Sequence, residues 1–251
     1  MKPLTSLFRH WLSQGRHALG ELFFPWFCPL CEAPATDSPF CDSCQENLLQ
    51  KASAPACGRC ALPLGPWSQN QGGCFECRGR PLGFDAALAL GPYEGKIRDL
   101  CLRLKHEANA WLAPWLAKLL IEARPESREF PPDSWVVPIP LHWRRRWERG
   151  YNQAEALASG FARHLSLRLV QPLRRARATP HLADSGRAER ARVMRNAFSL
   201  RARYHNLTGR TVLLVDDILT TGATCGAAAR ALKRAGARRV VTLVIGRTEG
   251  T

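Results

Sequence analysis

Residues 212–224 read Val-Leu-Leu-Val-Asp-Asp-Ile-Leu-Thr-Thr-Gly-Ala-Thr. The first four are apolar and predict a short buried strand that ends at the adjacent carboxylates Asp216 and Asp217. A turn of small and hydroxyl-bearing residues follows, and 227–233 then has the composition of a helix. The carboxylates can accept hydrogen bonds from sugar hydroxyls, and amides at a helix N-terminus can hold a phosphate. The pattern predicts a sugar-phosphate site at the end of a strand.

This stretch resembles the phosphoribosyl-pyrophosphate (PRPP) motif of the type I phosphoribosyltransferases. The resemblance implies that Asp216 and Asp217 bind the 2′- and 3′-hydroxyls of the ribose. It also implies that the following turn cradles the 5′-phosphate, through Thr220, Thr221, Gly222, Ala223 and Thr224. A plain strand–turn–helix unit with a solvated acidic end is the alternative, but it requires the acidic pair and the Thr-Thr-Gly spacing to coincide by chance.

The composition is that of a folded and strongly basic protein. The chain has 251 residues, 45% of them hydrophobic, which is enough for one large domain or two smaller ones. Its formal net charge is +15 with histidine neutral. Two zinc ions bound by eight thiolates would reduce that charge to about +11. Such an excess of positive charge favours phosphorylated ligands or nucleic acid, without choosing between them.

The first residues carry apolar side chains at helical spacing, interrupted by basic and polar residues. That interruption argues against the apolar core of a signal peptide. No apolar run in the chain approaches the roughly 18 residues that span a bilayer. We therefore expect an amphipathic helix at 1–24 that packs on a domain, a cytoplasmic location, and no stable insertion into a membrane.

The cysteines point to metal binding, because ten cysteines in a cytoplasmic protein seldom form disulfides. Eight of them form four Cys-x-x-Cys pairs before residue 80: Cys28/Cys31, Cys41/Cys44, Cys57/Cys60 and Cys74/Cys77. Two pairs complete a four-cysteine site, so we expect two structural zinc ions that stabilise a module poor in apolar core. Redox pairs or an iron–sulfur cluster are the alternatives. Sequential and interleaved pairing both use all eight thiolates, and both stay open.

Two cysteines stand apart from these pairs. Cys101 lies in an apolar helical pattern and is expected to be a small core residue. Cys225 follows the phosphate turn at a helix start, where the pKa of a thiol can fall. A small residue packed under the turn is the favoured interpretation of Cys225.

Apolar periodicity along the rest of the chain predicts alternating strands and helices. Strands are expected at 83–92, 136–141, 167–173, 197–200, 212–215 and 240–246. Helices are expected at 152–164 and 227–233, and two more within 94–121, where Asn109 and Pro114 suggest a break between them. This alternation is typical of an α/β fold with a mostly parallel sheet, whose ligands bind at the carboxyl ends of the strands. We expect a zinc module at 25–80, a strand and helices linking it to the core at 81–134, and a phosphoribosyltransferase-like domain at 135–251.

A second basic motif follows the strand expected at 136–141. Residues 138–153 read Pro-Ile-Pro-Leu-His-Trp-Arg-Arg-Arg-Trp-Glu-Arg-Gly-Tyr-Asn-Gln. The four arginines can bind a pyrophosphate beside the phosphate turn. Trp143, Trp147 and Tyr151 among them can stack on bases, as in proteins that bind single-stranded nucleic acid. A solvated basic loop is an equally weighted alternative.

Taken together, these motifs resemble the competence protein F (ComF/GntX) family, from about residue 22 to residue 247. The resemblance implies a pyrophosphate site made by Pro140, Leu141, His142, Arg144 and Arg149. Lys105, Gly150, Asn152 and Gln153 match two family signatures. The resemblance to this family also implies a link to DNA uptake in competence or to the use of external DNA.

The segment expected to form a flap over the substrate, 178–195, departs from the family pattern. Leu182 stands where the family usually has a glutamine, and Val193 where it usually has an asparagine. These differences bear on catalysis more than on PRPP binding. Residues 171–210 hold ten arginines and two acidic residues. They could close over a polyanion, contact nucleic acid or form an exposed loop.

Two functions follow from these observations. The first is transfer of a phosphoribosyl group from PRPP, with Mg²⁺ arriving on the PRPP, to an acceptor that no residue identifies. The second is a non-catalytic accessory protein that senses PRPP or a related nucleotide, or that binds single-stranded DNA or a protein of the competence machinery.

Overall fold

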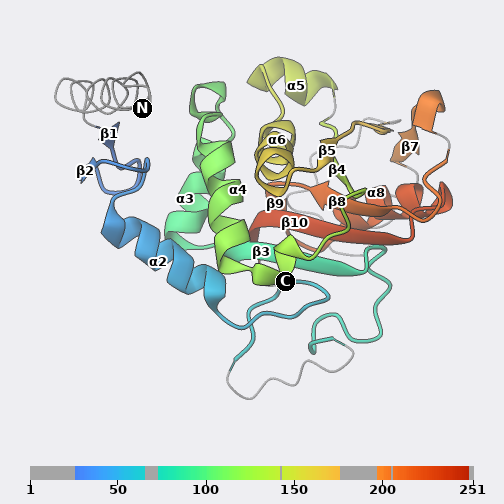
Figure 1. Ribbon diagram of the computed structural model, residues 1–251, viewed down its shortest axis with the longest axis horizontal. Coiled ribbons are helices and arrows are strands. Elements are labelled where there is room, and N and C mark those ends of the chain that lie inside the picture. The colour runs from blue at the N-terminus through green and yellow to red at the C-terminus, as the bar shows by residue number, and fades with distance from the viewer. Residues whose placement is uncertain (1–25, 66–72, 142, 176–196, 205, 249–251) are drawn as a thin grey trace, which may run out of the picture. The chain divides into compact units, whose positions relative to one another are not determined.

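A computed structural model describes residues 26–65, 73–141, 143–175, 197–204 and 206–248 (Figure 1). The helix expected at 1–24, the flap at 178–195 and His142 lie outside these residues. The chain divides into two compact units, residues 1–47 and 48–251. No described helix is both long enough and apolar enough to cross a bilayer.

The first unit contains a small antiparallel ribbon and the start of a helix. β1 (Trp26–Phe27) pairs with β2 (Pro34–Ala35), and the turn between them includes Glu32 at a φ of 61°. α2 (Asp42–Ser53) begins here and continues into the second unit. Our sequence analysis did not predict α2. Its charges favour a helix, because Asp42 lies in the first turn and Lys51 in the last, where each complements the helix dipole.

The second unit is built on one parallel sheet, which confirms the predicted α/β class. The strands are β3 (Ala86–Pro92), β10 (Arg239–Arg247), β8 (Thr211–Val215), β4 (Trp135–Pro138) and β5 (Arg168–Leu169), in that order across the sheet. β9 (Ile218–Leu219) pairs with the end of β10. β6 (Leu173–Arg175) and β7 (Phe198–Leu200) form a separate antiparallel hairpin.

Among the described residues, four helices pack against the strands: α3 (Gly95–Arg103), α4 (Leu112–Ala123), α6 (Gln153–Leu165) and α8 (Ala223–Arg234). The second unit also contains the short helix α5 (Trp143–Arg149) and 3₁₀ turns at Glu107–Asn109, Pro125–Arg128 and Ala202–Tyr204. α4 packs on α6 and β3, α6 packs on β4, and Figure 1 shows α3, α4 and α6 gathered over one side of the strands.

Strand β8 is buried along its whole length, as expected for a central parallel strand. Val212 and Leu214 join the apolar cluster that includes the buried side of α8, with Ala228 and Leu232. Since side chains alternate along a strand, Leu213 lies on the opposite face of the sheet. Both faces of β8 are therefore covered, and its carboxyl end is the part left for a ligand.

Two of the expected elements differ from the structure. The interpretation of 144–149 as a loop is wrong, because these residues belong to helix α5, which ends before Gly150 at a φ of 75°. The single strand expected at 167–173 is also wrong. It is split into β5 and β6 around Pro172, whose missing N–H interrupts a ladder of hydrogen bonds.

The contact between α4 and α6 depends on Gly160. A Cβ there would lie 2.8 Å from the Cα of Pro114 and 3.0 Å from the Cβ of Ala117. We expect Gly160→Ala to destabilise the fold by about 1–3 kcal/mol through overpacking, although alanine is favoured over glycine in a helix by about 1 kcal/mol. Urea unfolding should show this against Ser159→Ala, its partly exposed neighbour, as the control. A urea midpoint of Gly160→Ala at or above that of the wild-type chain would contradict the close contact between α4 and α6.

Candidate functional site

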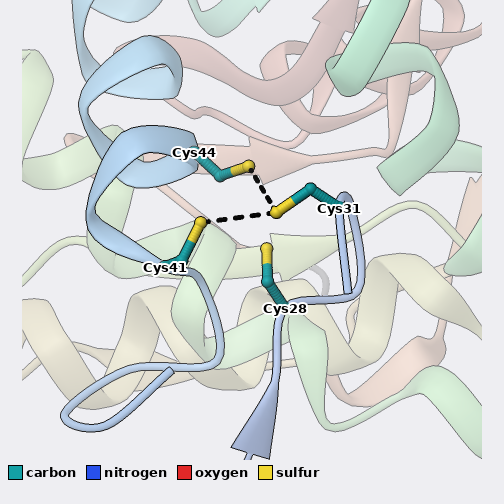
Figure 2. A group of neighbouring side chains, drawn as sticks. All are labelled: Cys28, Cys31, Cys41 and Cys44. Atoms are coloured by element: carbon teal, nitrogen blue, oxygen red, sulfur yellow. Dashed lines mark hydrogen bonds between the residues drawn. The ribbon is translucent and has the colours of Figure 1, made fainter. Parts of the chain in front are cut away.

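The first cysteine cluster lies within the first unit. Figure 2 shows Cys28 and Cys31, from the turn after β1, facing Cys41 and Cys44 at the start of α2. The Sγ of Cys31 is 3.4 Å from that of Cys41 and 3.5 Å from that of Cys44. Four thiolates at about 2.3 Å from a tetrahedral zinc ion lie roughly 3.8 Å from one another. The spacing of these sulfurs fits a zinc ion.

The second cluster lies within the second unit and is buried. The Sγ atoms of Cys57 and Cys77 are 3.6 Å apart, as are those of Cys60 and Cys74. Burial raises the pKa of Cys57, but hydrogen bonds from the amides of Cys60 and Cys74 outweigh this effect and lower it to about 7. Burial raises the pKa of the Cys60 and Cys77 thiols, so metal binding there has to displace their protons.

The two clusters settle the pairing of the cysteines. All ten cysteines are free of disulfides, and the ligand atoms within each cluster lie within 4.8 Å of one another. The pairs are used in sequential order, so the interleaved alternative is wrong. Four sulfurs around each centre leave no open ligand position, which makes both sites structural.

The two carboxylates lie at the carboxyl end of β8 and differ in their surroundings. Asp217 is buried, and its Oδ1 accepts from the amide of Ile218 at 2.9 Å. Its Oδ2 accepts from the Nε2 of Gln153 at 3.1 Å. Asp216 is half-buried and accepts from the amide of Asp217 at 3.0 Å. Burial and the charge of Asp217 raise the pKa of Asp216 well above its usual range, while the nearby charge of Arg175 acts in the opposite direction.

The turn expected to bind the 5′-phosphate, residues 220–224, comes after the two carboxylates and is called the phosphate turn below. Gly222 has a φ of 78° and is the N-cap of α8, so the helix begins at Ala223 and includes Thr224 in its first turn. The first amides of a helix have no partner within it, and together with the helix dipole they suit an anion. The hydroxyl of Thr221 accepts from the amide of Ala223 at 3.4 Å, and Thr220 is exposed.

The signature residues Asn152 and Gln153 join the two halves of the site. The Nδ2 of Asn152 donates to the carbonyl of Ile139 at 3.1 Å, which holds the loop after β4. The Oδ1 of Asn152 accepts from the amide of Ala154 and caps α6. Gln153, the next residue, donates to Asp217. One helix start therefore fixes both the predicted pyrophosphate loop and a predicted ribose carboxylate.

The other signature residues support this helix start. The hydroxyl of Tyr151 donates to the carbonyl of Leu104, next to Lys105. At Gly150, an added Cβ would collide with the carboxylate of Glu107. The two signatures, far apart in sequence, are therefore in contact. Cys101 is fully buried, a core residue as expected, and burial raises the pKa of its thiol. The charge of the half-buried Lys105 acts on this pKa in the opposite direction.

Cys225 is a packed residue and not a reactive thiol. It is 1% exposed. Burial and the charges of Asp216 and Asp217 raise its pKa well above the usual range. A thiolate is the reactive form, so this environment favours the structural interpretation.

Pro140 and Leu141, from the predicted pyrophosphate loop, line a cavity of about 200 Å³. Four arginines share it: Arg146, Arg174, Arg175 and Arg201. The one acidic residue in its wall, Glu155, accepts from Arg146 at 2.9 Å. The side chain of Arg144, like His142, lies outside the described part of the chain. Arg149 is half-buried and is not among the residues that line the cavity.

Our sequence analysis missed the three arginines on the hairpin. Arg174 and Arg175 lie on β6, and Arg201 follows β7. The excess of arginine at 171–210 was visible, but only the pairing of Leu173 with Leu200 brings the three together beside the loop after β4. The alternating pattern of such short strands is too brief to reveal that pairing.

Comparison with known proteins agrees with this arrangement. A phosphoribosyl transferase domain matches residues 155–249, and a double zinc ribbon domain matches residues 19–78. DNA utilization protein YhgH of Salmonella typhi is 31% identical over 234 residues, which cover 90% of this chain and 99% of the relative. The protein of the same name from Escherichia coli K12 is 30% identical, over 95% and 96% of the two chains. Competence protein F of Haemophilus influenzae is 28% identical, over 87% and 95%.

The two cysteine clusters predict two zinc ions per chain. Metal analysis of the purified full chain, kept reduced throughout, should find both. Cys57→Ser should remove one ion and lower the melting temperature of the second unit by roughly 5–10 °C, since a few kcal/mol shift a domain of this size by that amount. Cys31→Ser should remove the other ion and serves as the matched control. One zinc ion or none in the wild-type chain would show that the sulfur geometry does not hold metal.

Proposed function

The chain belongs to the family of DNA utilization protein YhgH and competence protein F, and we propose that its phosphoribosyltransferase domain binds PRPP together with Mg²⁺. In this proposal Asp216 and Asp217 bind the ribose hydroxyls, and the turn from Thr220 to Thr224 binds the 5′-phosphate. The pyrophosphate occupies the cavity beside Pro140 and Leu141. His142, Arg144 and Arg149 complete the pyrophosphate contacts on the grounds of family resemblance.

One observation carries this proposal: anion-binding groups lie on both sides of a carboxylate pair at a single sheet edge. Pro138 of β4 pairs with Val215 of β8, and the amide of Ile139 donates to the carbonyl of Val215 at 2.9 Å. The loop after β4 and the carboxylates after β8 are therefore neighbours. A sugar with a phosphate at one end and a pyrophosphate at the other requires this order of groups.

Gln153 adds an unused acceptor. Its Nε2 is bound to Asp217, but its Oε1 is buried and has no hydrogen-bond partner within the described part of the chain. Buried polar atoms are normally paired, so this atom calls for a partner that the described residues do not supply. A ribose hydroxyl that donates to Gln153 would satisfy it.

For catalysis, the chain would have to stabilise the departing pyrophosphate and exclude water from the oxocarbenium-like state at ribose C1. The guanidinium groups around the cavity can offset the charge that develops on the leaving group, and Mg²⁺ carried by PRPP would add to this effect. No described residue near Asp216 stands out as a base for an incoming nucleophile. The acceptor is therefore left unnamed.

A second candidate function is that of an accessory protein that binds single-stranded DNA or senses PRPP without turnover. Trp147 on α5 is 86% exposed and lies next to Arg146 in the sequence. An exposed aromatic ring among arginines suits a base that stacks and a phosphate that pairs. The names of the relatives refer to DNA utilization and competence, so a protein of the competence machinery is a further proposed partner.

We place the chain in the cytoplasm because its ten cysteines are free of disulfides and eight of them form two clusters that can hold a metal ion. Thiolates of this kind persist in a reducing compartment. We also propose that the chain consists of a helix at 1–24, a zinc module at 25–80, linking elements at 81–134 and a core domain at 135–251.

The PRPP proposal is tested by replacing both carboxylates. Charged hydrogen bonds contribute about 1.5–3 kcal/mol each, so Asp216→Asn combined with Asp217→Asn should weaken Mg-PRPP binding by at least about tenfold. Titration calorimetry should also show that EDTA weakens binding to the wild-type chain. The control is Asp133→Asn, an exposed residue that pairs with Arg210. Equal affinities of the double variant and the wild-type chain for Mg-PRPP would show that the two carboxylates do not contribute to binding.

The DNA-binding alternative is tested by salt dependence. Each phosphate neutralised on a single strand contributes about −0.7 to the slope of log affinity against log salt. Arg146→Ala should therefore reduce the slope by about that amount. Trp147→Ala should lower affinity by about 1–3 kcal/mol without changing the slope, because a stacked base carries no charge. Trp111→Ala, another exposed tryptophan, is the control. Absence of binding at low salt, or a slope insensitive to Arg146, would exclude this role for α5.

A further inference from the structure

Arg247 joins the second zinc cluster to the phosphate turn. It lies at the end of β10, is 4% exposed, and its Nε donates to the carbonyl of the zinc ligand Cys60 at 2.7 Å. Its Nη1 donates to the carbonyl of Thr220 at 2.7 Å and to that of Leu219 at 3.1 Å. One planar guanidinium group therefore bridges a metal ligand and the first residue of the turn.

The hydrogen bonds of Arg247 are unusual for a buried charge. No ion pair with a carboxylate is found for it among the described residues, and the acceptors that its guanidinium group contacts are backbone carbonyls. The rigid fork of a guanidinium can reach acceptors in two directions at once, whereas an ammonium group is a single point charge. The position therefore requires arginine for its geometry as well as for its charge.

Residues 82–84, which follow the second cluster in the chain, also pack directly on the start of α8. An added Cβ at Gly226 would collide with the carbonyl of Leu82, and one at Gly83 would lie 2.5 Å from the carbonyl of Gly226. The ring of Phe84 would be 3.5 Å from a Cβ on Gly222. The backbone after the cluster and the backbone after the phosphate turn are in close contact, so neither can shift alone.

Little free space separates the cluster from the turn. A cavity of only about 10 Å³ is lined by residues from both, among them Cys60, Cys77, Thr221 and Arg247. This is about the smallest cavity that can hold one water molecule. A displacement of the cysteine turn would therefore reach Thr220 and its neighbours.

The turn that carries Cys60 is itself in need of support. Ala61 has a φ of 56°, a left-handed conformation that is unfavourable for a residue with a Cβ. The amide of Ala61 donates to the carbonyl of Cys57 at 2.7 Å, which closes a tight turn between two ligands. Without a metal ion, no metal–sulfur bond joins the four cysteines, and backbone hydrogen bonds such as this one are left to hold the turn.

We infer that Arg247 is a positioning residue, through which zinc at the second cluster holds the phosphate turn in its binding conformation. The metal fixes the carbonyl of Cys60, Arg247 binds this carbonyl and that of Thr220, and the turn is thereby kept in place. The inference rests on the proposed function only for the identity of the ligand as PRPP. Zinc at the first cluster, in the other unit, has no part in it.

Hydrogen exchange of the full-length protein tests the bridge without any ligand. Arg247→Lys keeps the charge but not the fork, so amides in 218–226 should exchange at least about tenfold faster, within the range of about 5–150-fold that is common for coupled sites. Both zinc ions should remain bound. The matched control is Arg239→Lys, an exposed residue at the start of the same strand. Unchanged exchange in Arg247→Lys would overturn the inference.

The cysteine variants supply a second measurement that does not depend on the stability of Arg247→Lys. Cys60→Ser should speed exchange in 218–226, and Cys31→Ser, in the first cluster, should not. Equal effects of the two substitutions, or no effect of either, would overturn the inference.

Zinc release tests the same coupling from the other direction. Because coupling between two sites is reciprocal, saturating PRPP should slow the removal of one of the two zinc ions by a chelator, and Arg247→Lys should abolish this protection. If the wild-type chain binds PRPP and zinc release is unaffected, the inference fails while the proposed function stands. If the wild-type chain does not bind PRPP, the proposed function fails and the exchange measurements decide on Arg247.

Discussion

The hydrogen bond from Gln153 to Asp217 holds the candidate site together. It ties the start of α6 to the end of β8, two elements that the sheet alone would leave free to separate at this edge. Asn152 ties the same helix start to the carbonyl of Ile139. Two consecutive side chains thus fix the predicted pyrophosphate loop and the predicted ribose carboxylate with respect to each other. In the proposed function the separation of these groups has to match the length of a ribose, so this local rigidity would decide whether PRPP fits.

The zinc clusters differ in what they stabilise. The cysteines of the second cluster belong to the apolar core of the second unit, together with Leu62, Leu82 and Phe84. A metal there replaces side-chain packing that a segment rich in glycine and proline cannot supply. The first cluster lies beside a two-residue ribbon and the start of α2, and few other interactions are found among residues 26–47. The same Cys-x-x-Cys motif therefore adds to an apolar core in the second unit, whereas in the first unit it supplies most of the stabilisation found among the described residues.

The sequence predicted those parts of the fold that depend on local pattern. The run from Val212 to Thr224 predicted a strand, a turn and a helix, and all three are present because each has its own local signal. Helix α5 was missed because the charges at 144–149 suggested a solvated loop. The arginine cavity and the hydrogen bonds of Arg247 were also missed, since both depend on contacts between residues far apart in the chain. Arg247 and Cys60 are 187 residues apart, and no periodicity connects them.

The charges of the site explain why a strongly basic chain has an acidic pair at its centre. Arginines suit phosphate groups, but they cannot accept hydrogen bonds from sugar hydroxyls, whereas carboxylates can. Burial and repulsion by Asp217 raise the pKa of Asp216, so holding both carboxylates charged is costly. A hydroxyl that donates to Asp216 favours the charged form and lowers that cost. Arg175 reduces it from the cavity side. In the proposed function, ligand binding and ionisation of Asp216 are therefore linked, because Arg175, which would attract a phosphate, also favours the carboxylate form that would bind the sugar.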